Sequence, residues 1–210
     1  MSGIISIFLL ILFLIGLGIH KIKQKNRPDH NPANTGVVYT EEDIKQKPKP
    51  VYKPVREIPE KFRRDTHLPT APEGETSDRR NAELFSPGRD LIYFDDKRVV
   101  WESDNDKNDI ECDHSMHKSM EKPLRLLIEL VCARGGTLEV QDSYRPIGIH
   151  NPRSLHKEGR AIDLTCDELG LEQLACLCWG AGFDWVYYEA SSRGGAHVHC
   201  SVKRNHVQPK

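Results

Sequence analysis

The sequence predicts an α+β domain, in which a small, mainly antiparallel sheet carries helices on one face. The first indication is an amphipathic helix at residues 119–134, where apolar side chains recur at spacings of three and four. The second is a series of short strand and helix patterns that follows this helix. The third is an aromatic-rich strand pattern at residues 183–188, written FDWVYY.

The individual elements follow in order along the C-terminal half. Gly135 and Gly136 end the first helix, because glycine adopts the backbone conformation of a C-cap without strain. Residues 170–180 predict a second helix, since their leucine, alanine and cysteine side chains share one face. The strand patterns occupy residues 137–141, 160–165, 183–188 and 196–202.

Composition excludes some classes of protein. The chain has 210 residues, with 30 basic and 31 acidic side chains and a formal net charge of −1. A mean hydropathy of −0.57 excludes a protein with many membrane spans. Proteins that bind nucleic acid normally carry a basic excess, so this balance of charge predicts no nucleic-acid partner.

Three regions differ in composition. Residues 1–20 contain the uncharged run from Gly3 to Ile19, which is just long enough to span a bilayer as a helix. We expect an uncleaved membrane anchor here, with a cleaved signal peptide as the alternative. Residues 21–88 are rich in proline and charge, which predicts a largely disordered linker. Residues 89–210 are expected to form the folded domain.

Three segments of this domain carry candidate metal ligands. His156, Asp163 and one of the pair His197 and His199 offer two imidazoles and one carboxylate, a donor set that suits zinc with one open position, and His150 is a further candidate just upstream. His197 and His199 are two residues apart on a predicted strand, so both project from the same face. The alternative is that His156 and Asp163 form a surface ion pair and that the two later histidines have no chemical role.

The same segments resemble known families. The stretch SLHKEGRAIDL resembles the signature S-x-H-x-x-G-x-A-x-D of the zinc D-Ala-D-Ala peptidases, and DSYRP resembles an element of the vancomycin-resistance dipeptidases in that group. GRAIDL, AGFDWVYYE and AHVHCSV are also similar to the Hedgehog amino-terminal signalling domain, which shares the peptidase fold and zinc site. The resemblance covers about residues 124–202 and implies zinc ligands at His156, Asp163 and His199.

The resemblance to the peptidases implies metal-assisted hydrolysis of a peptide bond. Glu189, which follows WVYY, is then the candidate for proton transfer, and His197 is a donor to the developing oxyanion. Arg145 would pair with a substrate carboxylate or with the oxyanion. The position that holds glutamate in the dipeptidases is Ala196 here. A structural alternative for Glu189 is an ion pair with Arg193.

These inferences combine into one hypothesis of function. The chain is expected to be a membrane-anchored zinc metallopeptidase that hydrolyses murein stem peptides, or another peptide, as a D-Ala-type carboxypeptidase or endopeptidase. The membrane is contacted through the N-terminal helix, and the C-terminal domain is expected in the periplasm. Lys21, Lys23 and Lys25 favour the opposite orientation. The alternative is a catalytically silent, zinc-binding Hedgehog-like module that binds a protein partner.

Overall fold

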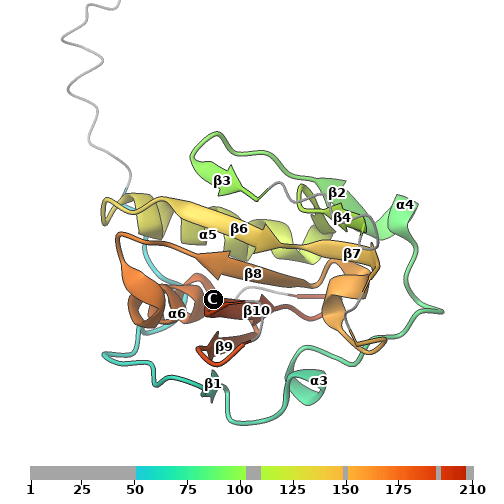
Figure 1. The fold of residues 1–210 in the computed structure, drawn as a ribbon, viewed down its shortest axis with the longest axis horizontal. Helices are drawn as coiled ribbons and strands as arrows, with labels where there is room; N and C mark the ends of the chain where they lie inside the picture. Colours follow the sequence, from blue (N-terminus) through green and yellow to red (C-terminus); the bar gives the residue numbers. More distant parts are fainter. Residues whose placement is uncertain (1–50, 103–109, 149–150, 193–194, 207–210) are drawn as a thin grey trace, which may run out of the picture. The chain divides into compact units, whose positions relative to one another are not determined.

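A six-stranded sheet forms the centre of the domain (Figure 1). The computed structural model describes residues 51–102, 110–148, 151–192 and 195–206. Within these ranges all neighbouring strands of the sheet are antiparallel except β3 and β6, so the predicted mainly antiparallel sheet is confirmed. In spatial order the strands are β1 (His67–Leu68), β9 (Trp185–Glu189), β10 (His197–Ser201), β8 (Ala161–Thr165), β6 (Leu138–Asp142) and β3 (Val99–Trp101).

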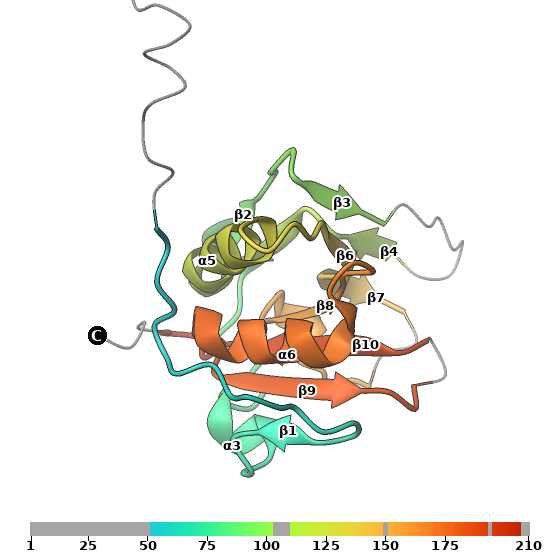
Figure 2. The same cartoon turned by 90° about the vertical axis from the view of Figure 1, so that its left-hand side faces the viewer.

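Two helices pack against each other and against this sheet. They are α5 (Glu121–Cys132) and α6 (Gly170–Ala181), and both predicted helices are therefore confirmed with ends within two residues. Figure 2 shows α6 running alongside β10 and β9, with α5 beside the upper part of the sheet. Their apolar side chains share one buried core with Ile162, Leu164 and Val198 of the sheet.

Several short elements complete the described part of the chain. None of them was predicted, because elements of three or four residues are too short to show a hydrophobic period. The four strands among them are held by pairing with a distant strand instead: β2 with β5, and β4 with β7. Their bounds are α3 (Glu73–Thr76), α4 (Pro87–Asp90), β2 (Leu91–Tyr93), β4 (Ile110–Cys112), β5 (Ser115–His117), η2 (Lys118–Met120), β7 (Tyr144–Ile147) and η3 (Leu155–Glu158).

Residues 51–88, which the sequence analysis assigned to the linker, contact the folded core. Phe62 is only 2% exposed, and β1 adds a short edge strand to β9. The guanidinium of Arg56 lies 4.4 Å from the ring centre of Trp179. Each of these contacts uses one or two side chains of a proline-rich stretch, so no periodic pattern marks it in the sequence.

The predicted anchor at residues 1–20 lies outside the described residues, as does the linker up to residue 50. Within the described ranges, no helix is both long enough and apolar enough to cross a membrane.

A buried ion pair ties the segment after α3 to the sheet. Arg160 and Glu158 are both fully buried, and Nε of Arg160 donates to Oε2 of Glu158 at 2.8 Å. The other guanidinium nitrogens of Arg160 donate to backbone carbonyls of Ser77, Asp78 and Val202. One side chain therefore satisfies polar groups on two segments and fixes where α3 lies relative to β8.

A pH-dependent contribution to stability is expected from His117, which is completely buried near this ion pair. Burial lowers its pKa to about 4, and the charge of Arg160 adds to the effect although Asp90 opposes it. An exposed histidine titrates near pH 6.5, so between about pH 6.5 and 4 the unfolded chain binds a proton that the native chain does not. Stability is therefore lost as the pH falls through this window.

We expect the free energy of unfolding to fall by up to about 3 kcal/mol across that window through His117 alone. Urea denaturation at pH 7, 5.5 and 4 measures the loss in the wild-type chain and in His117→Gln, which cannot titrate there. An equal loss in both proteins would contradict the prediction.

Candidate metal centre

Strand alternation places four polar side chains on one face of the sheet. In β8, Asp163 lies between two residues that point into the core, so its own side chain points to the opposite face. His199 of β10 is the register partner of Asp163, and His197 is the register partner of Glu189 in β9. The four side chains therefore lie together on the face away from the apolar core, and the predicted shared face of the two histidines is confirmed.

The turn of η3 brings His156 to the same place. The hydroxyl of Ser154 accepts a hydrogen bond from the backbone N–H of His156 and so caps this turn. Gly159 ends the turn with a φ of 62°, and a Cβ atom there would lie 2.9 Å from the backbone nitrogen of His117. The serine and the glycine of the SLHKEG motif therefore shape the turn that carries His156 and need not contact a metal themselves.

His156, Asp163 and His199 converge on one point. Their ligand atoms all lie within 4.8 Å of one another. Nδ1 of His156 lies 2.8 Å from the carbonyl oxygen of Ser143, to which it donates, so Nε2 is the ring nitrogen that faces the other two residues. This Nε2 lies 3.4 Å from both Nδ1 of His199 and Oδ2 of Asp163.

The donor set fits zinc. Two ligand atoms held tetrahedrally at about 2.0–2.1 Å from zinc are roughly 3.4 Å apart, which matches two of the three separations. The third is shorter, because Nδ1 of His199 forms a 2.7 Å contact with Oδ1 of Asp163. His156, Asp163 and His199 are therefore the residues that would hold the ion.

Glu73 is a further member of the site that sequence reasoning missed. Its Oε1 lies 2.8 Å from Nε2 of His199 and accepts a hydrogen bond from that nitrogen. This contact directs Nδ1 of His199 toward Asp163, as in the carboxylate–histidine pairs that orient metal ligands. Glu73 is 126 residues from His199 and belongs to no motif, so no signal in the sequence identified it.

The two carboxylates dominate the electrostatics of His199. Burial opposes protonation, but Glu73 and Asp163 outweigh it and raise the pKa of His199 well above its usual value. Burial likewise opposes ionisation of Asp163, but His156 and His199 hold its pKa well below the usual range. The carboxylate is therefore ionised at neutral pH, as a metal ligand must be, while a metal has to displace a proton from His199.

Replacing Glu73 tests its orienting role. Glu73→Gln keeps an amide oxygen near His199 but removes the charge, so we expect the affinity for zinc to fall about tenfold to a hundredfold. Competition with a chromophoric chelator measures this affinity. The matched control is Glu75→Gln, an exposed residue of the same short helix, which should bind zinc as the wild type does. Equal affinity in both variants would remove Glu73 from the site.

Two of the three predicted catalytic residues lie beside the candidate metal ligands, and the third does not. His197 and Glu189 line the same cavity as the three ligands, with a volume of about 410 Å³, and Nε2 of His197 lies 3.4 Å from Oε2 of Glu189. Arg145 is not among the residues that line this cavity, and its guanidinium pairs with Asp142. Arg193, the proposed partner of Glu189, lies outside the described residues.

The fold and site define an α+β domain with a His–Asp–His set as its candidate metal ligands, of which His156 and Asp163 are buried. The model of one family, the Hedgehog amino-terminal signalling domain, matches residues 40–201. The chain belongs to this family. The Hedgehog part of the resemblance seen in the sequence is thereby confirmed, whereas the D-Ala-D-Ala peptidase part receives no support.

Curated proteins similar to the chain agree with the family. Indian hedgehog B protein of Danio rerio is 49% identical over 75 residues, which are 34% of this chain and 17% of that protein. Tiggy-winkle hedgehog protein of Danio rerio is 36% identical over 129 residues, or 59% of this chain and 29% of that protein. Protein hedgehog of Drosophila erecta is 37% identical over 130 residues, which are 60% of this chain and 26% of that protein. The chain thus spans less than a third of the length of these relatives.

These matches correct the hypothesis of function. The predicted hydrolysis of murein stem peptides is wrong, because the chain belongs to a family of signalling domains and its relatives are hedgehog proteins of animals. The predicted murein partner and the predicted periplasmic, membrane-anchored location are wrong for the same reason. The zinc-ligand motif is similar in both families, and Arg145, which favoured the peptidase, pairs with Asp142 and does not line the cavity over the ligands.

Proposed function

We propose that the chain is a zinc-binding signalling domain whose metal face binds a protein partner. The observation that carries the proposal is the convergence of His156, Asp163 and His199 beside a cavity of about 410 Å³. Zinc held there would supply a Lewis acid and a cross-link between η3, β8 and β10. Membership of the Hedgehog signalling family supports a protein partner rather than a small substrate.

The residues around the ligands favour a rigid binding face. Ser143 and Glu73 each hold one histidine by its second ring nitrogen, at 2.8 Å in both cases. Two of the ligands are almost fully enclosed, since His156 is only 1% exposed and Asp163 5%. A face that is ordered before binding loses little conformational entropy when a partner docks, which favours affinity.

Zinc-dependent hydrolysis of a peptide bond is the second candidate. It is favoured by Glu189 and His197, which line the same cavity as the ligands and lie within reach of each other. In this case Glu189 would accept and pass on a proton, and His197 would donate to the carbonyl oxygen of the bond that is cut.

The test uses the purified full chain, with and without zinc, on cells of the source organism. For a signalling ligand we expect about one zinc per chain, saturable binding to intact cells and displacement by unlabelled wild type but not by Asp163→Asn. Incubation with a library of synthetic peptides, followed by mass spectrometry, measures cleavage. Zinc-dependent cleavage that is lost in Glu189→Gln would favour the second candidate. Equal affinity for cells with and without zinc would overturn the first.

A further inference from the structure

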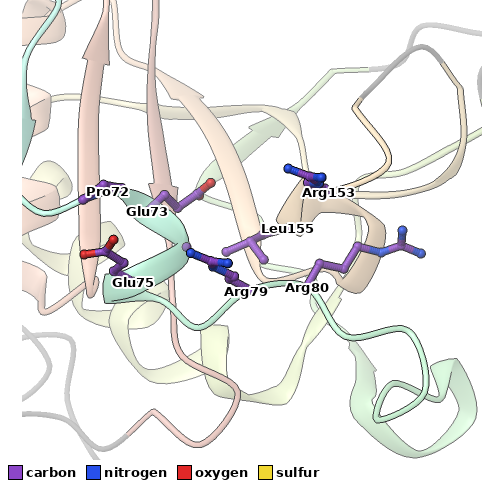
Figure 3. A pocket seen from close by; sticks show the side chains of 8 residues that line it. Pro72, Glu73, Glu75, Arg79, Arg80, Arg153 and Leu155 are labelled. Carbon is purple, nitrogen blue, oxygen red and sulfur yellow. The ribbon is translucent and has the colours of Figure 1, made fainter.

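A second cavity adjoins the metal site and is lined by a different set of charged side chains. Its volume is about 650 Å³, and it is lined by α3, the segment that follows α3 and the start of η3 (Figure 3). Glu73 and Arg153 line both this cavity and the one over the metal ligands. A partner that covers the metal face therefore also reaches the second cavity.

Three arginines from two distant segments meet in this cavity. Arg79 and Arg80 follow α3, whereas Arg153 precedes η3, and Figure 3 shows Leu155 among the three side chains. Within the described residues, no carboxylate oxygen lies within 4.0 Å of any of the three guanidinium groups. Nε of Arg80 is buried and has no hydrogen-bond partner in the same set. None of the three arginines therefore forms an ion pair within the described residues.

The backbone contacts around the arginines hold this arrangement in place. The buried guanidinium of Arg160 binds the carbonyls of Ser77, Asp78 and Arg79, which fixes the segment that carries two of the three arginines. Arg80 also donates through Nη1 to the carbonyl of Pro152, directly before Arg153. Like charges repel, so a fold that fixes three of them around one cavity favours an anion there.

We propose that this cavity binds a carboxylate side chain from an acidic peptide segment of the protein partner. Three arginines against Glu73 and Glu75 leave an excess of one positive charge, which a single carboxylate neutralises. A planar carboxylate also matches the two parallel N–H groups of a guanidinium. A doubly charged or polymeric anion would exceed this charge and would face Glu75. The proposal rests on the proposed function, since it names the chemistry of the partner.

The test titrates the zinc-loaded full chain with a short peptide of glutamate and glycine, acetylated and amidated at its ends. The arginine Nε–H signals in ¹⁵N NMR spectra report where it binds. We expect a peptide with glutamine in place of glutamate to bind the wild-type chain at least about tenfold more weakly. The glutamate peptide should bind the double variant Arg79→Gln/Arg153→Gln at least about tenfold more weakly too, because charge-assisted hydrogen bonds are lost in both cases. Arg64→Gln, at an exposed arginine away from the cavity, should bind as the wild type does.

Inorganic sulfate and phosphate form the second arm of the experiment. Tighter binding of either anion than of the acidic peptide would overturn the carboxylate assignment. Unchanged peptide affinity in the double variant would overturn the site itself. Zinc content is measured in every sample: a chain that binds zinc but not the peptide contradicts this proposal alone, whereas peptide binding without bound zinc contradicts the metal part of the proposed function.

Discussion

The variant Asp163→Asn is expected to lose zinc binding and the stabilisation that zinc brings. Asp163 is 5% exposed, and its carboxylate contacts both His156 and His199, at 3.4 and 2.7 Å. A structural zinc site contributes about 10 kcal/mol or more of binding free energy, shared among three or four ligands. Loss of one charged ligand should therefore lower the affinity for zinc by roughly a hundredfold or more.

Two measurements check this result. Chelator competition gives the affinity, and thermal unfolding with and without zinc gives the rise in midpoint that the ion produces, which should disappear in the variant. Asp167→Asn is the matched control, because Asp167 is an exposed residue just after β8. Zinc binding by Asp163→Asn at wild-type strength would show that the three side chains do not form the metal site.

The variant Arg160→Met is expected to be among the most destabilising single changes in the domain. It would leave Glu158 with Arg204 as its remaining cationic partner and would remove donors from the carbonyls of Ser77 and Val202. Breaking a buried ion pair from one side costs about 3–5 kcal/mol, because the remaining charge stays buried without full compensation. The segment after α3 also loses its attachment to Arg160. Glu73 of α3 would then orient His199 less firmly, so the affinity for zinc should fall.

Urea denaturation measures the loss of stability, and Arg125→Met is the control. Arg125 forms an exposed ion pair with Glu121 at 2.9 Å on the surface of α5, where such pairs contribute about 0.5 kcal/mol or less. A loss of under 1 kcal/mol in Arg160→Met would contradict the role given to this side chain. Replacing Arg160 and Glu158 together with apolar residues should cost less than the single change, since no fully buried charge of the pair remains and only the partly exposed Arg204 loses its partner.

The sequence determined the features that depend on neighbouring residues. Helices α5 and α6 were predicted because apolar spacing reports which helical face is buried, and β10 was predicted because alternation separates His197 and His199 from the core. The three candidate ligands were identified differently, because each belongs to a short motif that resembles known families. Those motifs are similar in two families, however, so the sequence patterns alone did not separate a signalling domain from a peptidase.

Only the tertiary structure revealed what surrounds the ligands. Glu73 meets His199 across 126 residues, and Arg160 binds carbonyls more than 80 residues earlier in the chain. The same contacts attach residues predicted to be linker and bring three arginines to one cavity beside the metal site. Such contacts involve single side chains from distant segments, which leave no period or spacing in the sequence, and they exist only once the core has placed those segments together.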